Sequence, residues 1–186
     1  MAGNQEQVLV ELSGDGSCLL WCEGLECSAQ TDFRNRSQLE ERKKMAVISP
    51  PPGYSVLNNV LDVVKPMDVF LLNLFKQDDS LGVFLKNLGG ILKHILNSEN
   101  HNINAEELAG RLGYQFETII SGLKWWQAKE EITLQERSGQ FRITKGRKTP
   151  SNDLQAITNR LQTELRETAA FRSYYGRADP VSLLRL

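Results

Sequence analysis

The stretch from Ile103 to Lys145 constrains the fold of this 186-residue chain more than any other. Asn104 can cap a short helix, and Glu107 lies three residues later, as a capping-box partner would. That helix is expected to end at Gly113, because glycine takes the positive φ of a helix C-terminus without steric cost. A second helix follows, and its apolar residues recur at a spacing that predicts one buried face: Phe116, Ile119, Ile120, Leu123 and Trp126.

Two strands joined by Ser138-Gly139 close this stretch, and a longer helix is expected ahead of it over residues 81–97. A long helix, two short helices and two strands in this order are typical of a winged helix-turn-helix. Gly89 and Gly90 lie in the middle of the long helix, where each glycine costs about 1 kcal/mol relative to alanine. We therefore expect either a kink or very close packing against a neighbour at this point.

The first half of the chain predicts a small α/β sheet. Residues 8–12 and 18–22 each read as a strand, and the Asp15-Gly16 turn between them predicts a hairpin. Residues 45–49 and 68–74 are apolar runs typical of strands covered on both faces, with a helix capped by Ser55 between them. Strand, helix and strand at this spacing make a βαβ unit, whose two strands should be parallel.

Two further helices are expected. Residues 32–44 read as a surface helix, whose later part begins at a Ser37 cap. Residues 151–175 predict a long amphipathic helix. Its apolar stripe is Leu154, Ile157, Leu161, Leu165, Thr168, Phe171 and Tyr175. Its expected water-facing residues are Arg160, Glu164, Arg166 and Glu167.

The fold class is therefore α/β plus α+β. A small α/β sheet, made of a hairpin and a parallel βαβ unit, is followed by a winged helix-turn-helix and a long C-terminal helix. We expect a small α/β domain over residues 1–78 and a winged-helix domain over 79–148. The C-terminal amphipathic helix and tail then occupy residues 149–186.

Composition weighs against several function classes. The formal net charge of −1 gives no global basic field to attract nucleic acid, whereas dedicated nucleic-acid binders show a basic excess or a basic face. No apolar run approaches the ~18 residues of a membrane span, so we expect a cytoplasmic protein without a membrane partner. Cys18, Cys22 and Cys27 are an odd number in a chain without a signal peptide, which predicts reduced, packed thiols.

The sequence offers no enzyme motif. The loop over residues 49–55 lacks a glycine-rich phosphate motif, and its three prolines remove backbone donors. The chain also lacks a Ser/His/Asp constellation, a His-Glu-x-x-His motif and an Asp-His-His motif for two-metal phosphoester cleavage. His94 and His101 have no metal-ligand pattern around them. We expect no catalytic residue, no cofactor and no metal ligand in this chain.

Duplex recognition would use the side of the second short helix opposite its apolar stripe. The positions expected there are Glu117, Thr118, Ser121, Gly122, Trp125 and Lys129. With one lysine and no arginine, this side is poorly suited to phosphate and guanine contacts. The face and the near-neutral net charge together weigh against an independent transcription regulator.

Basic residues are more frequent around the second wing strand, where a single strand could stack on Trp125 and have its charge neutralised. The candidate nucleic-acid contacts are Trp125, Lys129, Arg137, Arg142, Lys145, Arg147 and Lys148. In the alternative interpretation the two tryptophans only pack against the rest of the fold. Packing is favoured for Trp126, which belongs to the buried stripe, and both interpretations stay open for Trp125.

A family resemblance adds to these patterns. The segments MAVISPPPGY, DVFLLNLF and ITLQERSGQFRITK, in that order, resemble the C-terminal domain of bacterial RecJ-type single-stranded-DNA exonucleases. The closing ETAAFRSYYGRADPVSLL resembles the tail of such proteins in cyanobacteria, and the resemblance runs over nearly the whole chain from Val8. In that family the 5′–3′ nuclease centre, which uses divalent metal, lies in earlier domains.

The resemblance implies a non-catalytic accessory domain that supports DNA engagement or partner contact in DNA repair and recombination. Its implied partners are nuclease core domains of the same or another chain, together with single-stranded DNA and repair proteins. The alternative is a stand-alone protein-interaction scaffold with no nucleic-acid role.

Overall fold

The computed structural model describes residues 2–25, 27, 32–137, 140–146 and 153–184; the side chains of residues 2–6 and 137 lie outside the description. The chain forms two compact units. Unit 1 comprises Met1–Gln77 and Ala169–Leu186, and unit 2 comprises Asp78–Thr168. The long helix α6, Leu154–Tyr175, supplies residues to both units. The fold is therefore mixed α and β, with a parallel sheet in unit 1 and an antiparallel sheet in unit 2.

Unit 1 is built on a parallel sheet of three strands in the order β1-β2-β3. The strands are β1 (Cys18–Trp21), β2 (Lys44–Val47) and β3 (Asp68–Leu71). Helix α2, Tyr54–Val64, connects β2 to β3, whose parallel pairing places Met45 opposite Val69. The predicted βαβ unit is confirmed. β1 pairs with the other side of β2 and is also parallel to it.

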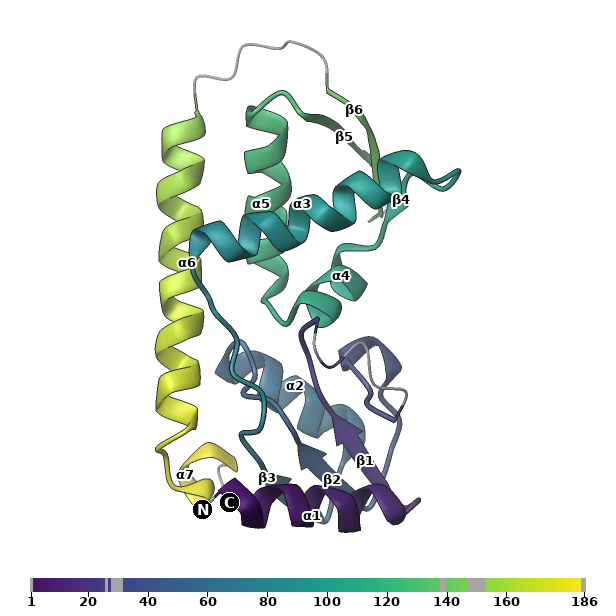
Figure 1. Ribbon diagram of the computed structural model, residues 1–186, viewed down its shortest axis with the longest axis vertical. Helices are drawn as coiled ribbons and strands as arrows, with labels where there is room; N and C mark the ends of the chain where they lie inside the picture. Colours follow the sequence, from purple (N-terminus) through teal and green to yellow (C-terminus); the bar gives the residue numbers. More distant parts are fainter. Residues whose placement is uncertain (1, 26, 28–31, 138–139, 147–152, 185–186) are drawn as a thin grey trace. The chain divides into compact units, whose positions relative to one another are not determined.

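Helices cover both faces of this sheet (Figure 1). Successive strand residues point to opposite faces, so Leu19 and Met45 pack with α2 while Leu20 and Ala46 pack with Leu12 of α1. Helix α1 spans Ala2–Gly14. The end of α6 and the short helix α7, Pro180–Leu184, complete the layer on the α2 side, with Tyr175 and Leu183 buried.

The predicted hairpin is wrong, because residues 8–12 are helical and belong to α1. Val8, Leu9 and Leu12 have the i, i+1, i+4 spacing of one helix side, and all three contact the core. The Asp15-Gly16 turn is present but joins a helix to a strand. Asp15 Oδ2 lies 2.8 Å from Lys44 Nζ, so the turn is tied to the first residue of β2.

The surface helix predicted over residues 32–44 is also wrong. The described residues there contain only one turn of 3-10 helix, η2 (Arg36–Gln38), and its cap is Asn35 in place of Ser37. Arg34 bridges in parallel to Trp21, and this pairing holds the segment against β1. Helix α2 likewise has Gly53 as its N-cap, with no side-chain cap, where Ser55 was expected.

The expectation of reduced thiols fails for one pair of cysteines. Cys22 and Cys27 form a disulfide with a Cα–Cα distance of 5.5 Å, which lies in the usual range, and Cys18 is a free thiol. Both bridged residues are buried in the layer between the sheet and α1. The expectation that these cysteines pack in the interior therefore holds for this pair.

Unit 2 contains an antiparallel sheet of three strands in the order β4-β6-β5, which Figure 1 labels. Its strands are β4 (Asn102–Ile103), β5 (Ile132–Arg137) and β6 (Gln140–Lys145). Its helices are α3 (Leu81–Asn97), α4 (Ala105–Leu112), α5 (Phe116–Ala128) and the first part of α6. β4 was not expected; it pairs Asn102 with Arg142. The predicted turn Ser138-Gly139 lies outside the described residues.

The ends of α4 follow the sequence signals. The Asn104 side chain accepts hydrogen bonds from the backbone N–H groups of Glu106 and Glu107, at 3.0 and 3.3 Å. Gly113 ends the helix with φ 72°, in the left-handed region. The cap at Asn104 and the helix end at Gly113 are therefore confirmed. The helix predicted over residues 81–97 is likewise confirmed as α3.

Helices α3 and α5 pack very closely. A Cβ on Gly89 would lie 2.5 Å from Cζ2 of Trp126, and a Cβ on Gly122 would lie 2.6 Å from Leu88 Cδ2. Each helix thus presents a glycine to a large side chain of the other. Gly90 faces open space. Of the two explanations for the glycine pair, close packing is therefore the one observed at Gly89.

We expect opposite effects from Gly89→Ala and Gly90→Ala. The first should destabilise unit 2 by about 1–3 kcal/mol, as overpacking of a filled core does. The second should stabilise it by about 1 kcal/mol, because alanine replaces glycine in an open helix position. Urea unfolding of both variants checks this, and a stabilised Gly89→Ala would contradict the close contact.

The Asp15–Lys44 pair should make stability depend on acid pH. The hydrogen bond from Lys44, helped by those from Ser17, holds the pKa of the Asp15 carboxyl well below its usual value. A lowered folded-state pKa adds stability that is present above the ordinary pKa and is lost as pH falls. Asp15→Asn should therefore lower the free energy of unfolding at pH 6, and its difference from wild type should shrink progressively below about pH 4, near the ordinary pKa. Asp62→Asn, an exposed aspartate on α2, is the matched control.

Candidate nucleic-acid interface

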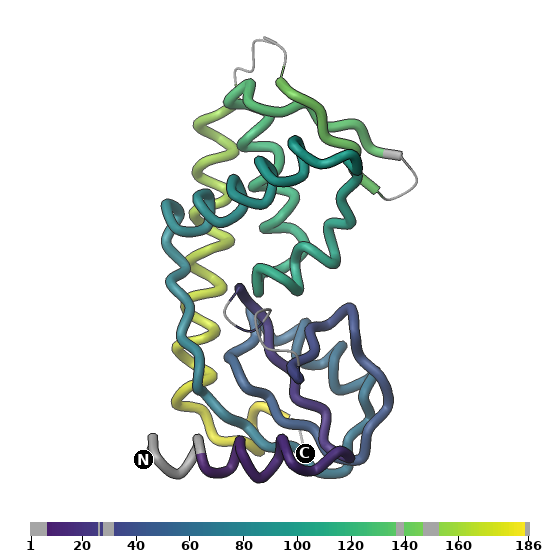
Figure 2. The backbone as a smooth tube through the Cα atoms, turned by 45° about the vertical axis from the view of Figure 1, so that its right-hand side comes forward, coloured from purple at the N-terminus to yellow at the C-terminus, as the bar shows by residue number. Residues whose placement is uncertain are grey.

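Half of the side of α5 that was expected to face outward is buried. Thr118 and Ser121 are 1% and 3% exposed, and Gly122 is buried as well. Helix α6 runs alongside α5 in Figures 1 and 2, and Ser121 Oγ donates a 3.0 Å hydrogen bond to Glu164 Oε1. Helix α3 covers Gly122. The prediction that these three positions face outward is wrong. At Ser121 and Gly122 the reason is the packing of α6 and α3, which the residue pattern of α5 alone does not show.

The same packing corrects one prediction for α6. Glu164 was expected to face water, but its side chain is only 15% exposed. Besides accepting from Ser121, it accepts a 2.8 Å hydrogen bond from Arg160 Nε, one turn earlier on the helix. The apolar stripe of α6 contributes to the cores as predicted, with Leu161, Leu165 and Tyr175 buried.

Trp125 is half-buried and engaged by its neighbours. Its Nε1 donates a 3.0 Å hydrogen bond to Thr158 Oγ1 of α6, and its ring meets that of Trp126 edge to face with centroids 5.3 Å apart. Lys129 Nζ lies 5.4 Å from the centroid of the Trp125 ring, in a cation–π contact. The structure thus brings Trp125 and Lys129 together. The polar edge of this indole is already used inside unit 2.

The basic residues of β5 and β6 whose side chains are described do not share one face. Arg142 and Lys145 are three residues apart on β6, so their side chains leave opposite faces of the sheet. Lys145 is exposed at the strand end and pairs with Ile132. Arg137 is the last residue of β5, and its side chain lies outside the description. Arg147 and Lys148 also lie outside the described residues.

Arg142 belongs to a polar row that crosses all three strands on the outer face of the sheet. Its partners in register are Asn102 on β4 and Gln135 on β5, and all three residues are exposed. Ile143, the next residue on β6, points to the other face and is fully buried. The sheet therefore has an apolar inner face and a polar outer face.

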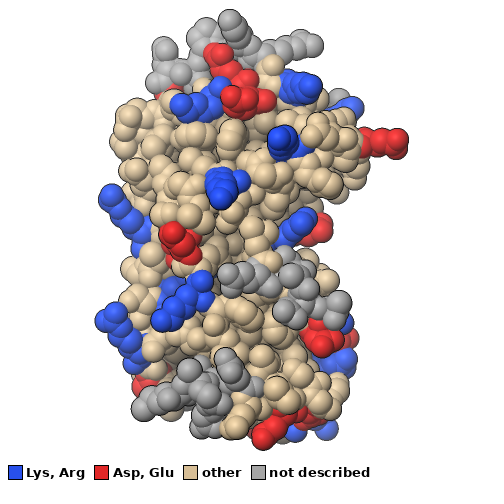
Figure 3. Space-filling model, in the orientation of Figure 1, with Lys and Arg blue, Asp and Glu red and all other residues tan. Residues whose placement is uncertain are grey.

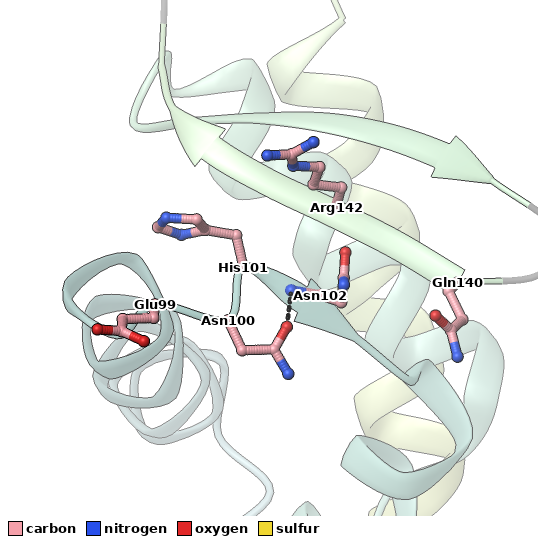
Figure 4. Close-up of a pocket in the computed structure, with 6 residues that line it drawn as sticks. All are labelled: Glu99, Asn100, His101, Asn102, Gln140 and Arg142. Atoms are coloured by element: carbon pink, nitrogen blue, oxygen red, sulfur yellow. Dashed lines mark hydrogen bonds between the residues drawn. The ribbon is translucent and has the colours of Figure 1, made fainter.

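A pocket of about 420 Å³ opens on this outer face (Figure 4). The six residues that line it are all polar: Glu99, Asn100, His101, Asn102, Gln140 and Arg142. Asn100 Oδ1 accepts a 3.0 Å hydrogen bond from the Asn102 backbone, which shapes the turn between α3 and β4. The Nδ1 of His101 is buried, and it has no hydrogen-bond partner among the described residues. Arg142 forms no ion pair with any residue that the structure describes.

Of the pocket residues, only Arg142 was among the sequence-predicted contacts. The others were missed because their polar stretch reads as a plain loop. The one available signal is the pair Asn102-Ile103, which stands directly before the helix cap Asn104. A polar residue followed by an apolar residue is the alternation of a half-buried strand. Two residues are too few for a pattern to be recognised with the sequence alone.

A second polar cluster lies in unit 1, just beyond the carboxyl end of β1. Glu23 is 5% exposed, and its carboxylate accepts hydrogen bonds from Arg36 Nε at 2.7 Å and from Trp21 Nε1 at 3.2 Å. Ser49 Oγ accepts from the Glu23 backbone N–H at 3.1 Å. Ligands of open α/β sheets bind at this end of the strands. Here the carboxylate is paired within the protein, so the cluster holds the loops together.

The charges visible on the surface do not form one basic field. Figure 3 shows basic and acidic side chains interspersed over the described part of the face that it presents. Within the described residues, no group of three or more His, Cys, Asp or Glu side chains could hold a metal ion. In the same part of the chain, no helix is long and apolar enough to cross a membrane.

Trp125→Phe should show whether the Trp125 hydrogen bond stabilises unit 2. Phenylalanine keeps an aromatic ring but loses the hydrogen bond to Thr158, which should cost about 0.5–1.5 kcal/mol of stability. Thr158→Val removes the other partner, and the double variant should cost less than the sum of the two singles. Urea unfolding measures the three losses; strictly additive losses would contradict a stabilising bond.

No family model matches the chain, and no curated protein or solved structure matches it either. What the chain does must therefore follow from the chemistry of the residues that its fold exposes.

Proposed function

We propose that this chain is a non-catalytic accessory domain that contacts single-stranded DNA through the outer face of the antiparallel sheet in unit 2. One observation carries the proposal. The outer face is exposed and polar, and it presents Arg142, which has no ion pair among the described residues, in a pocket large enough for a nucleotide. An unpaired guanidinium beside amide groups suits both phosphate and base contacts.

We also propose that unit 2 is a winged helix-turn-helix. In support, the element order is α3, β4, α4, α5, β5 and β6, and the short strand β4 pairs with β6. In this arrangement β5 and β6 would be the wing. The outer sheet face then takes the role in nucleic-acid contact that α5 would have in a duplex-reading protein.

Single strands suit this surface better than a duplex. A groove-reading helix needs an exposed face, but Thr118, Ser121 and Gly122 of α5 are covered. An open pocket, by contrast, can receive one unstacked nucleotide at a time. With few cations on the outer face, the affinity should be modest and only weakly salt-dependent, since each neutralised phosphate contributes about 0.7 to the slope for single strands.

The wider setting follows the resemblance to RecJ-type exonucleases. In this proposal the nuclease core, on the same or another chain, supplies the 5′–3′ cleavage and the divalent metal in the cytoplasm. This chain contributes DNA engagement or contact with repair proteins during repair and recombination. The specific alternative is a protein-interaction scaffold without a nucleic-acid role, which the net charge of −1 and the interspersed surface charges favour.

Binding of a labelled 20-nucleotide single strand that contains all four bases, measured at low salt, tests the proposal. Arg142→Gln should weaken binding several-fold, since it removes the one cation of the pocket. Lys145→Gln should have a smaller effect, because this side chain leaves the opposite face of the sheet. Lys93→Gln, on the exposed side of α3, is the matched control and should leave binding unchanged. Fluorescence anisotropy measures all three.

Two results would contradict the proposal. Absence of binding of this mixed-sequence single strand by the wild-type chain would remove the nucleic-acid role and favour the scaffold. Equal losses for Arg142→Gln and Lys93→Gln would mean that binding is diffuse and does not use the outer sheet face.

A further inference from the structure

The pocket on the outer sheet face has a lining that selects among chemical classes of ligand. It holds one cation, Arg142, and one anion, Glu99. The side chains of Asn100, Asn102 and Gln140 each carry both hydrogen-bond donors and an acceptor. In Figure 4, Glu99 lies at one side of the lining and Gln140 at the opposite side, while Arg142 projects from β6 and His101 lies between Arg142 and Glu99. A ligand in the pocket can therefore meet a guanidinium donor, a carboxylate acceptor and several amides.

A phosphate group would use only part of this lining. Its oxygens accept hydrogen bonds and carry negative charge, so they match Arg142 but are repelled by the Glu99 carboxylate. The amide oxygens would also find no donor on a phosphate. A nucleobase edge, in contrast, combines donors and acceptors in one plane. The lining therefore favours a base over a phosphate.

Among the bases, guanine matches both charged groups. Its O6 and N7 are adjacent acceptors for a bidentate arginine, and its N1–H and N2–H groups are adjacent donors for a carboxylate. Adenine, cytosine and thymine each lack at least one of these two pairs. Hydrogen bonds to charged groups are stronger than those to neutral groups, so Arg142 and Glu99 contribute most to the discrimination between bases. In a single strand both edges of the base are free.

We propose that this pocket binds a single unpaired guanine base, with Arg142 donating to O6 and N7 and Glu99 accepting from N1–H and N2–H. The proposal rests on the proposed single-strand binding, which it deepens: the chain would then engage single strands with a preference for guanine. The amides of Asn100, Asn102 and Gln140 would hold the base edge between the two charged groups.

Nuclear magnetic resonance of the ¹⁵N-labelled full chain tests the pocket directly. The side-chain amide signals of Asn100, Asn102 and Gln140 are followed during titration with dGMP, dAMP, dCMP, dTMP or inorganic phosphate. We expect dGMP to bind at least about tenfold more tightly than the other nucleotides, since a bidentate contact discriminates against a wrong base by that factor or more. Equal affinities, or equal shifts with inorganic phosphate, would overturn the assignment.

Glu99→Gln keeps the size of the side chain but replaces the carboxylate. It should reduce the preference for dGMP over dAMP several-fold, because the amide is a weaker acceptor and adds a donor that opposes N1–H. Glu167→Gln changes an exposed glutamate of α6 outside the lining and should leave the preference unchanged. An unchanged preference in Glu99→Gln would contradict the role given to the carboxylate.

Oligonucleotides separate this inference from the proposed function. A dT 12-mer with one central guanine is compared with the same 12-mer carrying adenine or cytosine there. Binding of all three without a preference would leave the proposed function standing and overturn the guanine pocket. Selective dGMP binding without binding of any 12-mer would leave the pocket standing and overturn the single-strand role. Absence of both would overturn both.

Discussion

The close contact between α3 and α5 is the interaction on which unit 2 depends. The Trp126 ring lies over Gly89, and Phe84 and Leu88 of α3 fill the space that Gly122 leaves on α5. The contact also carries an unfavourable term. Trp126 Nε1 is buried and has no hydrogen-bond partner among the described residues, which costs about 1–3 kcal/mol of folding free energy. Apolar burial of a large indole can offset a loss of this size. Dispersion and burial, not hydrogen bonding, therefore hold these helices together.

This packing decides what unit 2 can present to a ligand. Because Thr118 is buried, α6 contacts Ser121 and α3 covers Gly122, this side of α5 is turned to the interior. The antiparallel sheet is in a different position, since Ile103 and Ile143 turn one of its faces to the core and leave the other to solvent. Among the described side chains, the pocket on this face offers three amides, His101, one arginine and one glutamate. Such a surface gives little long-range attraction, and its selectivity must come from short-range hydrogen bonds.

Local signals explain which parts of the fold the sequence predicted. The βαβ unit, helix α3 and the end of α4 at Gly113 depend on residues close in sequence, and these were confirmed. Residues 8–12 were assigned to a strand because Asp15-Gly16 resembles a hairpin turn, although their spacing also fits a helix. The strand β4 and the burial of Ser121 depend on partners about 40 residues away in the sequence, on β6 and α6. A pattern within one element cannot report them.

Two charged clusters show why pairing matters more than location in recognising a site. Glu23 lies at the strand end where α/β sheets bind ligands, yet its carboxylate already accepts hydrogen bonds from Arg36 and Trp21. Because Glu23 is buried, a ligand would have to break its ion pair with Arg36 in order to bind there. Arg142 lies on the exposed face of a sheet and forms no ion pair with any described residue. A ligand can therefore use the hydrogen-bond donors of the guanidinium without breaking an ion pair. On energetic grounds, the outer sheet face of unit 2 is therefore better placed to bind a ligand than the carboxyl end of the parallel sheet.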